Sequence, residues 1–255
     1  MAAAKTIQLD GESLTFAQLY DVSLGGARVA LAPAAAKRMR ASRSVVERVV
    51  ASGATAYGVN TGFGELAEVR ISSDQIRQLQ LNLVRSHCCG VGALLSETEV
   101  RAMMVLRANA LAKGFSGVRT IVVETLCEML NHGVHPVVPS QGSVGASGDL
   151  APLAHLASVA IGEGEAIYDG ARVSGAEAMK RAGVAPLVLE AKEGLSLLNG
   201  TQGMLALLSL AIRDAQIICD TADVAAALSL DALRAEAPRR LTRASRQRGL
   251  MLVQR

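Results

Sequence analysis

Apolar residues recur at intervals of three or four along most of the chain, which is the spacing of an amphipathic helix. Residues that start or stop helices, such as Pro33 and Gly114, mark the boundaries. This pattern predicts helices over residues 13–21, 33–52, 73–91, 97–113, 118–131, 149–161, 175–182 and 203–235. Short alternating stretches predict strands over residues 6–9 and 27–31 and a hairpin over 166–173. We therefore expect a mainly α fold with a few short strands.

The last predicted helix differs from the others because apolar or small residues occupy most of its sides. A helix of this kind is buried among others, which is typical of the first helix of a bundle. We expect three parts: an N-terminal domain over residues 1–200, the start of a central long-helix bundle over 201–233, and a tail over 234–255.

The tail is rich in arginine and breaks the preceding hydrophobic pattern. It holds seven Arg and one Glu, whereas the whole chain has a formal net charge of +3, so residues 1–233 are mildly acidic. An acidic body argues against nucleic-acid binding by the globular part. We interpret the tail as the product of a truncated or frameshifted reading frame. The alternative is a real basic tail that is solvated or binds an acidic partner.

Composition restricts the class of protein further. Aromatic residues make up only 2% of a chain that is 50% hydrophobic, so Leu, Val, Ala and Met must fill the core. The four cysteines form no C-x-x-C motif, which argues against a disulfide framework or a zinc site. His132 and His135 have the spacing of a metal pair but lack a third ligand, so we expect no metal. Without an apolar leader or an uncharged apolar span of about 20 residues, we expect a cytoplasmic protein with no membrane partner.

The stretch from Gly142 to Leu153, Gly-Ser-Val-Gly-Ala-Ser-Gly-Asp-Leu-Ala-Pro-Leu, carries the most specific chemistry. A glycine-rich loop before a helix is usually a turn with an N-cap, here Asp149 or Ser147, and this one lacks the G-x-x-x-x-G-K-[ST] of a phosphate loop. A tight turn also allows the amide nitrogen of Gly148 to attack the carbonyl carbon of Ala146. Loss of two waters, one carrying the Ser147 hydroxyl, then gives 4-methylidene-imidazol-5-one (MIO), an electrophile made from the chain itself.

The whole string resembles the signature of the aromatic amino acid ammonia-lyases, a family that includes related aminomutases. The resemblance covers residues 5–233 and implies a carbon–nitrogen lyase. It further implies that Ala146, Ser147 and Gly148 form MIO autocatalytically, with no external cofactor, and that Asp149 assists.

Two other strings resemble the same family. These are Tyr57 to Gly64, Tyr-Gly-Val-Asn-Thr-Gly-Phe-Gly, and Leu197 to Thr201, Leu-Leu-Asn-Gly-Thr. Without the resemblance, Tyr57 reads as a packing residue with a bonded hydroxyl, and Asn199 reads as part of a turn. The resemblance implies that Tyr57 lies over the MIO and takes part in proton transfer. It also implies that Asn199 contacts both substrate and MIO.

His87 ends a predicted helix, where a lone histidine is more often a cap that complements the helix dipole than a ligand. Family members differ at the pair occupied here by Ser86 and His87, and Ser-His resembles the histidine-specific enzymes. An imidazole can hydrogen-bond a substrate imidazole, whereas Leu can only touch a phenyl ring. The resemblance thus implies that His87 binds L-histidine, which is deaminated to trans-urocanate and ammonia in histidine catabolism. A phenylalanine or tyrosine lyase, or an aminomutase, is the alternative within the family.

Family chains are much longer than this one and assemble as homotetramers whose sites are completed by neighbouring subunits. For this chain, assembly and independent activity stay open. The alternative from another class is therefore a catalytically incomplete fragment or a subunit-association piece.

Overall fold

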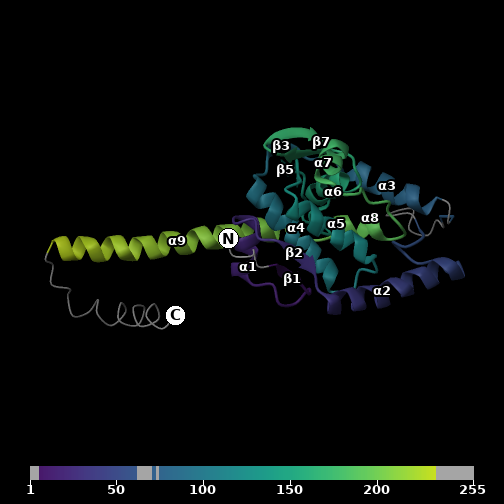
Figure 1. Ribbon diagram of the computed structural model, residues 1–255, viewed down its shortest axis with the longest axis horizontal. Coiled ribbons are helices and arrows are strands. Elements are labelled where there is room, and N and C mark those ends of the chain that lie inside the picture. Colours follow the sequence, from purple (N-terminus) through teal and green to yellow (C-terminus); the bar gives the residue numbers. More distant parts are fainter. Residues whose placement is uncertain (1–5, 62–70, 73–74, 234–255) are drawn as a thin grey trace. The chain divides into compact units, whose positions relative to one another are not determined.

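The computed structural model describes residues 6–61, 71–72 and 75–233. The chain divides into two compact units, Met1–Ser209 and Leu210–Arg255. The first unit holds every motif of interest, and Figure 1 colours it from purple to green along the chain.

Helices dominate the first unit, which confirms the mainly α prediction. They are α1 (Phe16–Ser23), α2 (Pro33–Ser52), α3 (Ile76–His87), α4 (Glu97–Ala112), α5 (Thr120–Asn131), α6 (Leu150–Ala160), α7 (Gly175–Ala182), α8 (Glu193–Leu198) and the start of α9 (Gln202–Ala232). The bounds predicted for α2 and α7 are confirmed at both ends. The prediction for α4 ended one residue later than the helix does.

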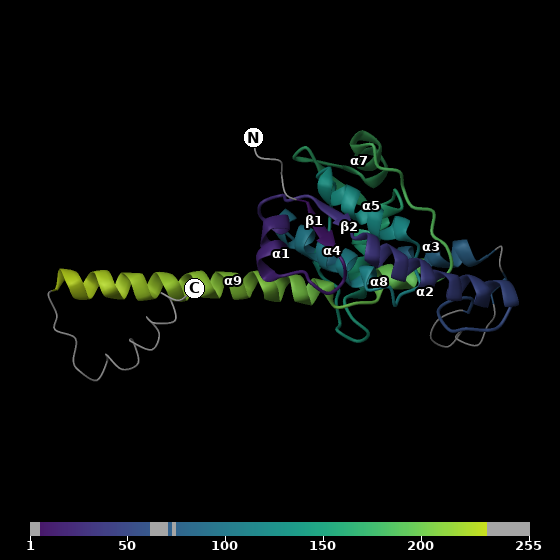
Figure 2. The same ribbon diagram turned by 60° about the horizontal axis from the view of Figure 1, so that its bottom comes forward.

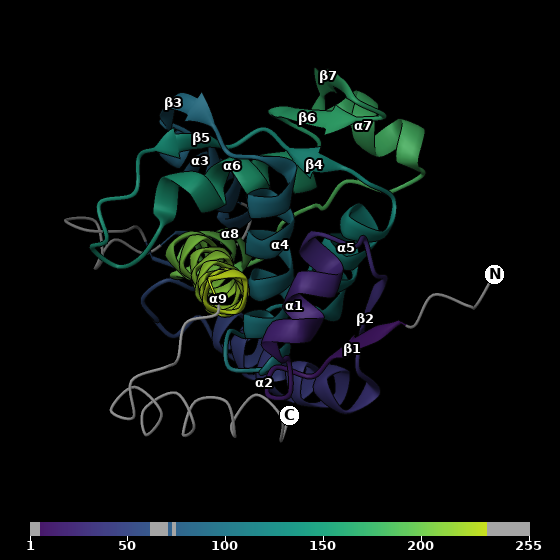
Figure 3. The ribbon, with the colours of Figure 1, turned by 90° about the vertical axis from the view of Figure 1, so that its left-hand side faces the viewer.

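The described strands are short and form three small sheets. β1 (Ile7–Leu9) pairs in parallel with β2 (Val29–Leu31), close to α1 and α4 in Figure 2. β3 (Val91–Leu94) is antiparallel to β5 (Pro139–Gln141). β4 (His135–Pro136) pairs with β6 (Glu165–Tyr168), which forms a hairpin with β7 (Ala171–Ser174) beside α7 (Figure 3).

The core is built around α4, which packs against α1 on one side and α5 on another (Figure 3). Ser96 and Glu99 form a capping box that starts α4, which satisfies amides that would otherwise lack partners. The largest fully buried side chains are all Leu or Met: Leu9, Met39, Met103, Met104, Leu111, Leu126, Met129, Leu153, Leu156, Met179, Leu197 and Leu198. Aliphatic and thioether side chains thus fill the core, as the composition predicts.

The C-terminal end of the helix predicted over residues 73–91 was wrong. The helix predicted to run to residue 91 ends at His87, because Cys88 leaves helical geometry with ψ of 60°, and residues 91–94 form β3 instead. Its predicted start at Ser73 lies outside the described residues. Helix α8 (Glu193–Leu198) was not predicted, and the turn signal of Asn199-Gly200 lies after its end.

We expected α9 to be buried among other helices, but its buried residues lie only in its first turns: Gln202, Gly203, Ala206 and Ser209. Later apolar residues such as Ile218, Val224 and Leu228 are exposed. By length and composition alone, Glu193–Ala232 could cross a membrane. The core helix of a soluble protein has the same length and composition, so this finding is weak evidence for a membrane span.

Candidate active site

The loop between β5 and α6 has an unusual backbone where the MIO tripeptide is predicted. Ser147 adopts φ of 63° and Gly148 φ of 112°, both in the region that L side chains rarely occupy. Ala146 and Ser147 are exposed, whereas Gly148 is buried. A Cβ at residue 148 would overlap the carbonyl oxygen of Gly200, so only glycine fits there. The loop therefore combines an exposed Ala-Ser pair with a backbone held tightly at the third residue.

Asp149 ties this loop to the start of α9. Its carboxylate is 1% exposed and accepts hydrogen bonds from Ser143 Oγ at 2.7 Å and from Met204 N at 2.9 Å. Its own amide donates to Gly200 O at 2.7 Å. Asp149 occupies the N-cap position of α6, but no side-chain cap bond to α6 is present. The carboxylate instead accepts from the third residue of α9, so the alternative reading of Asp149 as a local N-cap is wrong.

Asn199 lies one residue from this contact. It is exposed at the C-terminal end of α8, where its amide donates to Leu195 O at 2.9 Å. Gly200 O lies against Gly148, so the residue after Asn199 contacts the loop. A contact of Asn199 with substrate and MIO stays a prediction.

The turn that carries Tyr57 rests on the same short helix. A Cβ at Gly58 would meet Leu195 Cδ2 of α8 at 2.8 Å. Asn60 holds the turn, since its Oδ1 accepts from Ala56 N at 2.9 Å and its Nδ2 donates to Ala54 O at 2.8 Å. The Tyr57 side chain is 62% exposed. Residues 62–64 of this motif lie outside the described residues, and the placement of the ring over the loop stays a prediction.

His87 ends α3, and its ring is oriented by its own helix. Nδ1 lies 2.8 Å from Leu83 O and 3.1 Å from Ser86 Oγ. A ring nitrogen can hydrogen-bond to a carbonyl oxygen only when it carries a proton, so Nδ1 is protonated, and in the neutral ring Nε2 is then the acceptor.

The strands bring the end of α3 to the loop. Val91 of β3 pairs with Gln141 of β5, immediately before Gly142. A Cβ at Gly142 would lie 3.2 Å from Gly90 Cα, so the two segments touch. Gly90 N also donates to His155 Nε2 at 3.1 Å, and burial lowers the pKa of His155, which favours this acceptor form.

Arg107 is the polar residue that our sequence reading missed. It is 4% exposed on α4, where Nη1 donates to Gln202 Oε1 at 2.7 Å and Nη2 donates to Ser196 O. Burial lowers its pKa to about 10. A signal was present in the sequence, since residue 107 is a cation on an apolar helix with Met103 and Leu111 at i±4 rather than an acidic partner.

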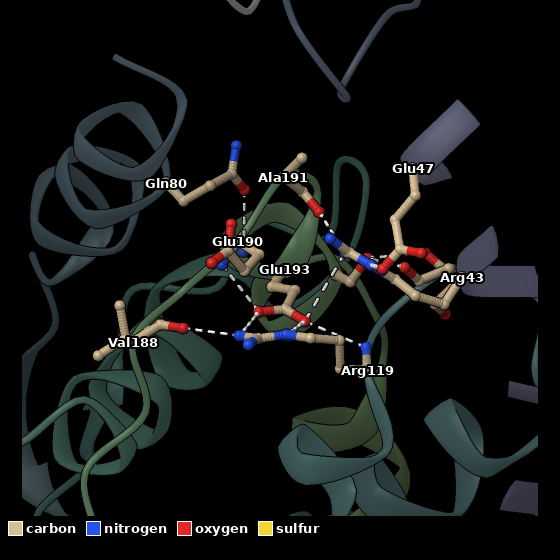
Figure 4. Close-up of polar contacts among 12 residues, drawn as sticks. Arg43, Glu47, Gln80, Arg119, Val188, Glu190, Ala191 and Glu193 are labelled. Carbon is tan, nitrogen blue, oxygen red and sulfur yellow. Dashed lines mark hydrogen bonds and ion pairs between the residues drawn. The ribbon is translucent and has the colours of Figure 1, made fainter. Parts of the chain in front are cut away.

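A separate ionic cluster holds the other end of α8 (Figure 4). Glu193 is fully buried, and Arg119 donates to both of its oxygens at 2.8 and 2.7 Å. Arg43 Nη1 lies 3.8 Å from Glu193 Oε1. Gln80 Oε1 accepts from Gly194 N at 2.9 Å and so caps the helix from α3.

Among the described residues, no group of three or more His, Cys, Asp or Glu has the arrangement of a metal site. His135 contacts other side chains: Arg101 Nη1 is 3.0 Å from its Nε2, and Glu97 Oε2 is 3.3 Å from its Nδ1. His132 Nδ1 lies 3.3 Å from Glu128 Oε2.

The fold and this loop define a mainly α domain that carries a closed, glycine-rich loop of the ammonia-lyase type. The family model for the aromatic amino acid lyases matches residues 14–250. The chain belongs to this family. The match extends past residue 233, into the tail that we expected to resemble nothing in the family.

Individual relatives support the same assignment. The chain is 57% identical over 230 residues to the histidine ammonia-lyase of Koribacter versatilis, which covers 90% of this chain and 45% of that protein. The structure of histidine ammonia-lyase from Trypanosoma cruzi matches with a TM-score of 0.85 and 40% identity over 91% of this chain and 45% of that one. Tyrosine aminomutase from Streptomyces globisporus matches with a TM-score of 0.85 and 40% identity over 90% of this chain and 43% of that one. The chain thus spans less than half the length of these relatives.

Proposed function

We propose that this chain forms MIO from Ala146, Ser147 and Gly148 and contributes it to a histidine ammonia-lyase. The reaction is the non-oxidative deamination of L-histidine to trans-urocanate and ammonia. The observation that carries the proposal is the backbone at Ser147 and Gly148, both at positive φ, beside the buried carboxylate of Asp149.

The ring closure balances within the tripeptide. The Gly148 nitrogen bonds to the Ala146 carbonyl carbon, and the Ala146 oxygen leaves as water with the amide hydrogens of Ser147 and Gly148. The Ser147 hydroxyl leaves as a second water with the Cα hydrogen, which creates the exocyclic methylene. No oxidant is required.

The residues present fit this group. Residue 148 is a glycine, and the close approach of Gly200 O leaves no room for a Cβ there. Asp149 holds the segment after the tripeptide through its amide and holds Ser143 before it through its carboxylate, so both flanks of the turn are tied. A backbone held in a bent conformation reduces the entropy cost of closing the ring.

When formed, MIO supplies an electrophilic methylene that takes up the substrate amine and makes it a better leaving group. We assign His87 to the substrate imidazole: its acceptor Nε2 suits an imidazole N–H. We assign Asn199 to the amino acid end of the substrate and Tyr57 to proton transfer. We also propose a cytoplasmic homotetramer in which neighbouring subunits complete the site.

Specificity for histidine rests on two supports. The curated relatives with 51–57% identity are histidine ammonia-lyases, and the Ser86-His87 pair is of the histidine type. Fold similarity does not separate the alternatives, since a histidine lyase and a tyrosine aminomutase match with the same TM-score of 0.85.

A chimera tests the proposal. The 230 matched residues of the Koribacter versatilis enzyme are replaced by those of this chain, and urocanate formation from L-histidine is followed by absorbance. We expect activity with histidine and none in the matched Ser147→Ala chimera, because no methylene can form. Products from tyrosine or phenylalanine would favour the alternative within the family. A folded but inactive chimera would favour a catalytically incomplete piece.

His87→Leu in the active chimera tests the assignment of the imidazole. The substitution leaves the substrate imidazole N–H without its hydrogen-bond acceptor, and we expect it to lower kcat/KM for histidine about tenfold or more. MIO formation is the control and should be unchanged. An unaltered kcat/KM would contradict the role of His87.

A further inference from the structure

Two arginines of α4 are almost equally buried, but they face different surroundings. Arg101 is 8% exposed and Arg107 is 4% exposed. Arg101 Nε donates to Val22 O at 2.9 Å, and its Nη1 donates to Leu130 O at 3.1 Å and approaches His135. Burial lowers the pKa of Arg101, and the negative charge of Glu97 opposes that shift. Arg101 therefore secures the packing of α4 away from the candidate site.

Neither arginine forms an ion pair in the part of the chain that the structure describes, but Arg107 also lacks a nearby carboxylate that favours its charge as Glu97 does for Arg101. Among residues 6–61, 71–72 and 75–233, no carboxylate lies within ion-pair distance of its guanidinium. Its Nε is buried without a hydrogen-bond partner in the same part of the chain. An unpaired buried charge is costly, so a protein that keeps one gains something else from its position.

The two bonds that Arg107 does make span the connection from α8 to α9. Ser196 O lies in α8, and Gln202 begins α9. Asn199 and Gly200 lie between these two acceptors. Arg107 therefore bridges both sides of the turn that presents them.

Gly200 connects the turn that Arg107 holds to the loop that contains the tripeptide. A Cβ at residue 200 would overlap Arg107 Nη1 and Gln202 Oε1 on one side. On the other side, Gly200 O accepts from Asp149 N and leaves no space for a Cβ on Gly148. The contacts thus run without a gap from Arg107 through Gly200 to Gly148.

We propose that Arg107 is a positioning residue for MIO formation, because it fixes the Ser196–Gln202 turn against the Ala146–Ser147–Gly148 tripeptide. This inference rests on the proposed function. The guanidinium acts through Gly200 and does not touch the reacting atoms. Its planar fork can reach both acceptors at once, whereas a lysine ammonium on a flexible stem cannot hold the same geometry.

The experiment compares the wild-type chain with Arg107→Met, Arg107→Lys and the matched control Arg101→Met. Peptide mass spectrometry measures the fraction of the 146–148 peptide that has lost two waters. Hydrogen exchange of residues 145–149 and 199–204 is measured on the same samples. Thermal unfolding reports the stability of each variant, and the Lys variant serves where the Met variant does not fold.

We expect Arg107→Met to slow dehydration on the order of 10- to 100-fold and to speed exchange in both segments, since small misplacements cost that much in oriented reactions. Arg107→Lys should recover part of both. Arg101→Met should lose stability but keep the dehydrated peptide. Normal dehydration in Arg107→Met, or equal loss in both Met variants, would overturn the inference.

An unmodified peptide in the wild-type chain would count against the proposed function and not against Arg107. Exchange then decides: faster exchange at 145–149 in Arg107→Met alone supports the positioning role, and unchanged exchange overturns it.

Discussion

The two ends of α8 are both held by buried charged groups from other elements, but the charges are arranged in opposite ways. At the N-terminal end, the buried carboxylate of Glu193 meets Arg119 and Arg43 (Figure 4). At the C-terminal end, the buried guanidinium of Arg107 donates to the Ser196 carbonyl oxygen and the Gln202 amide oxygen, and it has no ion-pair partner among the described residues. The first end is electrostatically compensated, and the second is not.

This difference indicates that the Glu193 end of α8 stabilises the fold and that the Arg107 end positions the candidate site. Glu193 gains enough hydrogen bonds to offset its desolvation, so its end can contribute to stability. The Arg107 end lies next to the loop with strained backbone. The unpaired charge and the strain cost stability there, and in return they fix the geometry of the site. Changes at the two ends should therefore affect different measurements.

The largest expected effect on stability is at the compensated end. Glu193→Gln leaves Arg119 and Arg43 without their buried counter-charge, and breaking such a pair costs about 3–5 kcal/mol in the free energy of unfolding. Urea denaturation measures it. The control is Glu190→Gln, which breaks the exposed pair with Arg77 at 2.6 Å and should cost less than about 1 kcal/mol. Equal losses in the two variants would contradict the assignment.

The pH dependence of stability sharpens this comparison. Burial by itself raises the pKa of Glu193, but hydrogen bonds from the Arg119 side chain and from the amides of Glu190 and Arg119 outweigh it, so its pKa is lowered from the ordinary 4.5. A lowered folded-state pKa means that the stabilisation is present above pH 4.5 and is lost as the pH falls through the folded-state value.

The wild-type chain should therefore lose stability below this pH more steeply than Glu193→Gln. The lowered pKa values of Asp10, Glu163 and Glu165 act in both proteins and cancel in the difference. Parallel pH profiles of the two proteins would show that the pKa of Glu193 is not lowered in the folded chain.

At the other end, Gly148→Ala is expected to stop dehydration of the tripeptide, because the new Cβ would overlap Gly200 O and force the loop away. The positive φ alone costs about 1–3 kcal/mol for a non-glycine residue. Gly145→Ala is the matched control, since Gly145 has φ of 73° but nothing within 4 Å of its Cβ position. It should be destabilised by strain alone and should still lose two waters. Peptide mass spectrometry separates the two; equal dehydration would refute the contact argument.

The smallest expected effect is that of Ser143→Ala. It removes the 2.7 Å hydrogen bond to Asp149 Oδ1 and should cost about 1 kcal/mol, since Ser143 is exposed and water can replace its hydroxyl. Dehydration should be slowed but complete. A variant that never dehydrates would mean that Ser143 takes part in the chemistry itself.

Much of this arrangement could be predicted from local patterns in the sequence. Pro33 begins α2 and Gly53 follows its last residue. Such start and stop signals act within a single turn of the chain, so they can be recognised in the sequence. The loop motif and the Asn199 turn could be found in the same way, because each is a continuous string of residues.

What the sequence could not supply depends on contacts between distant segments. The ordinary alternative for Asp149 is a cap on its own helix, but its carboxylate caps α9 instead, 55 residues further on. Likewise α8 was not predicted, because Gln80 of α3 and Arg119, immediately before α5, hold its first turn from distant parts of the chain. The turn signal of Asn199-Gly200 lies after the end of α8. Arg107 gave a local signal as an isolated cation, but its partners in α8 and α9 become apparent only in three dimensions.

The most direct test of the central claim is the mass of the peptide that contains Ala146, Ser147 and Gly148 in the purified wild-type chain. If the C-terminal end of α8 and Asp149 hold the tripeptide in its ring-closing geometry, this peptide will be lighter by two water molecules. A peptide of full, unmodified mass would contradict that claim.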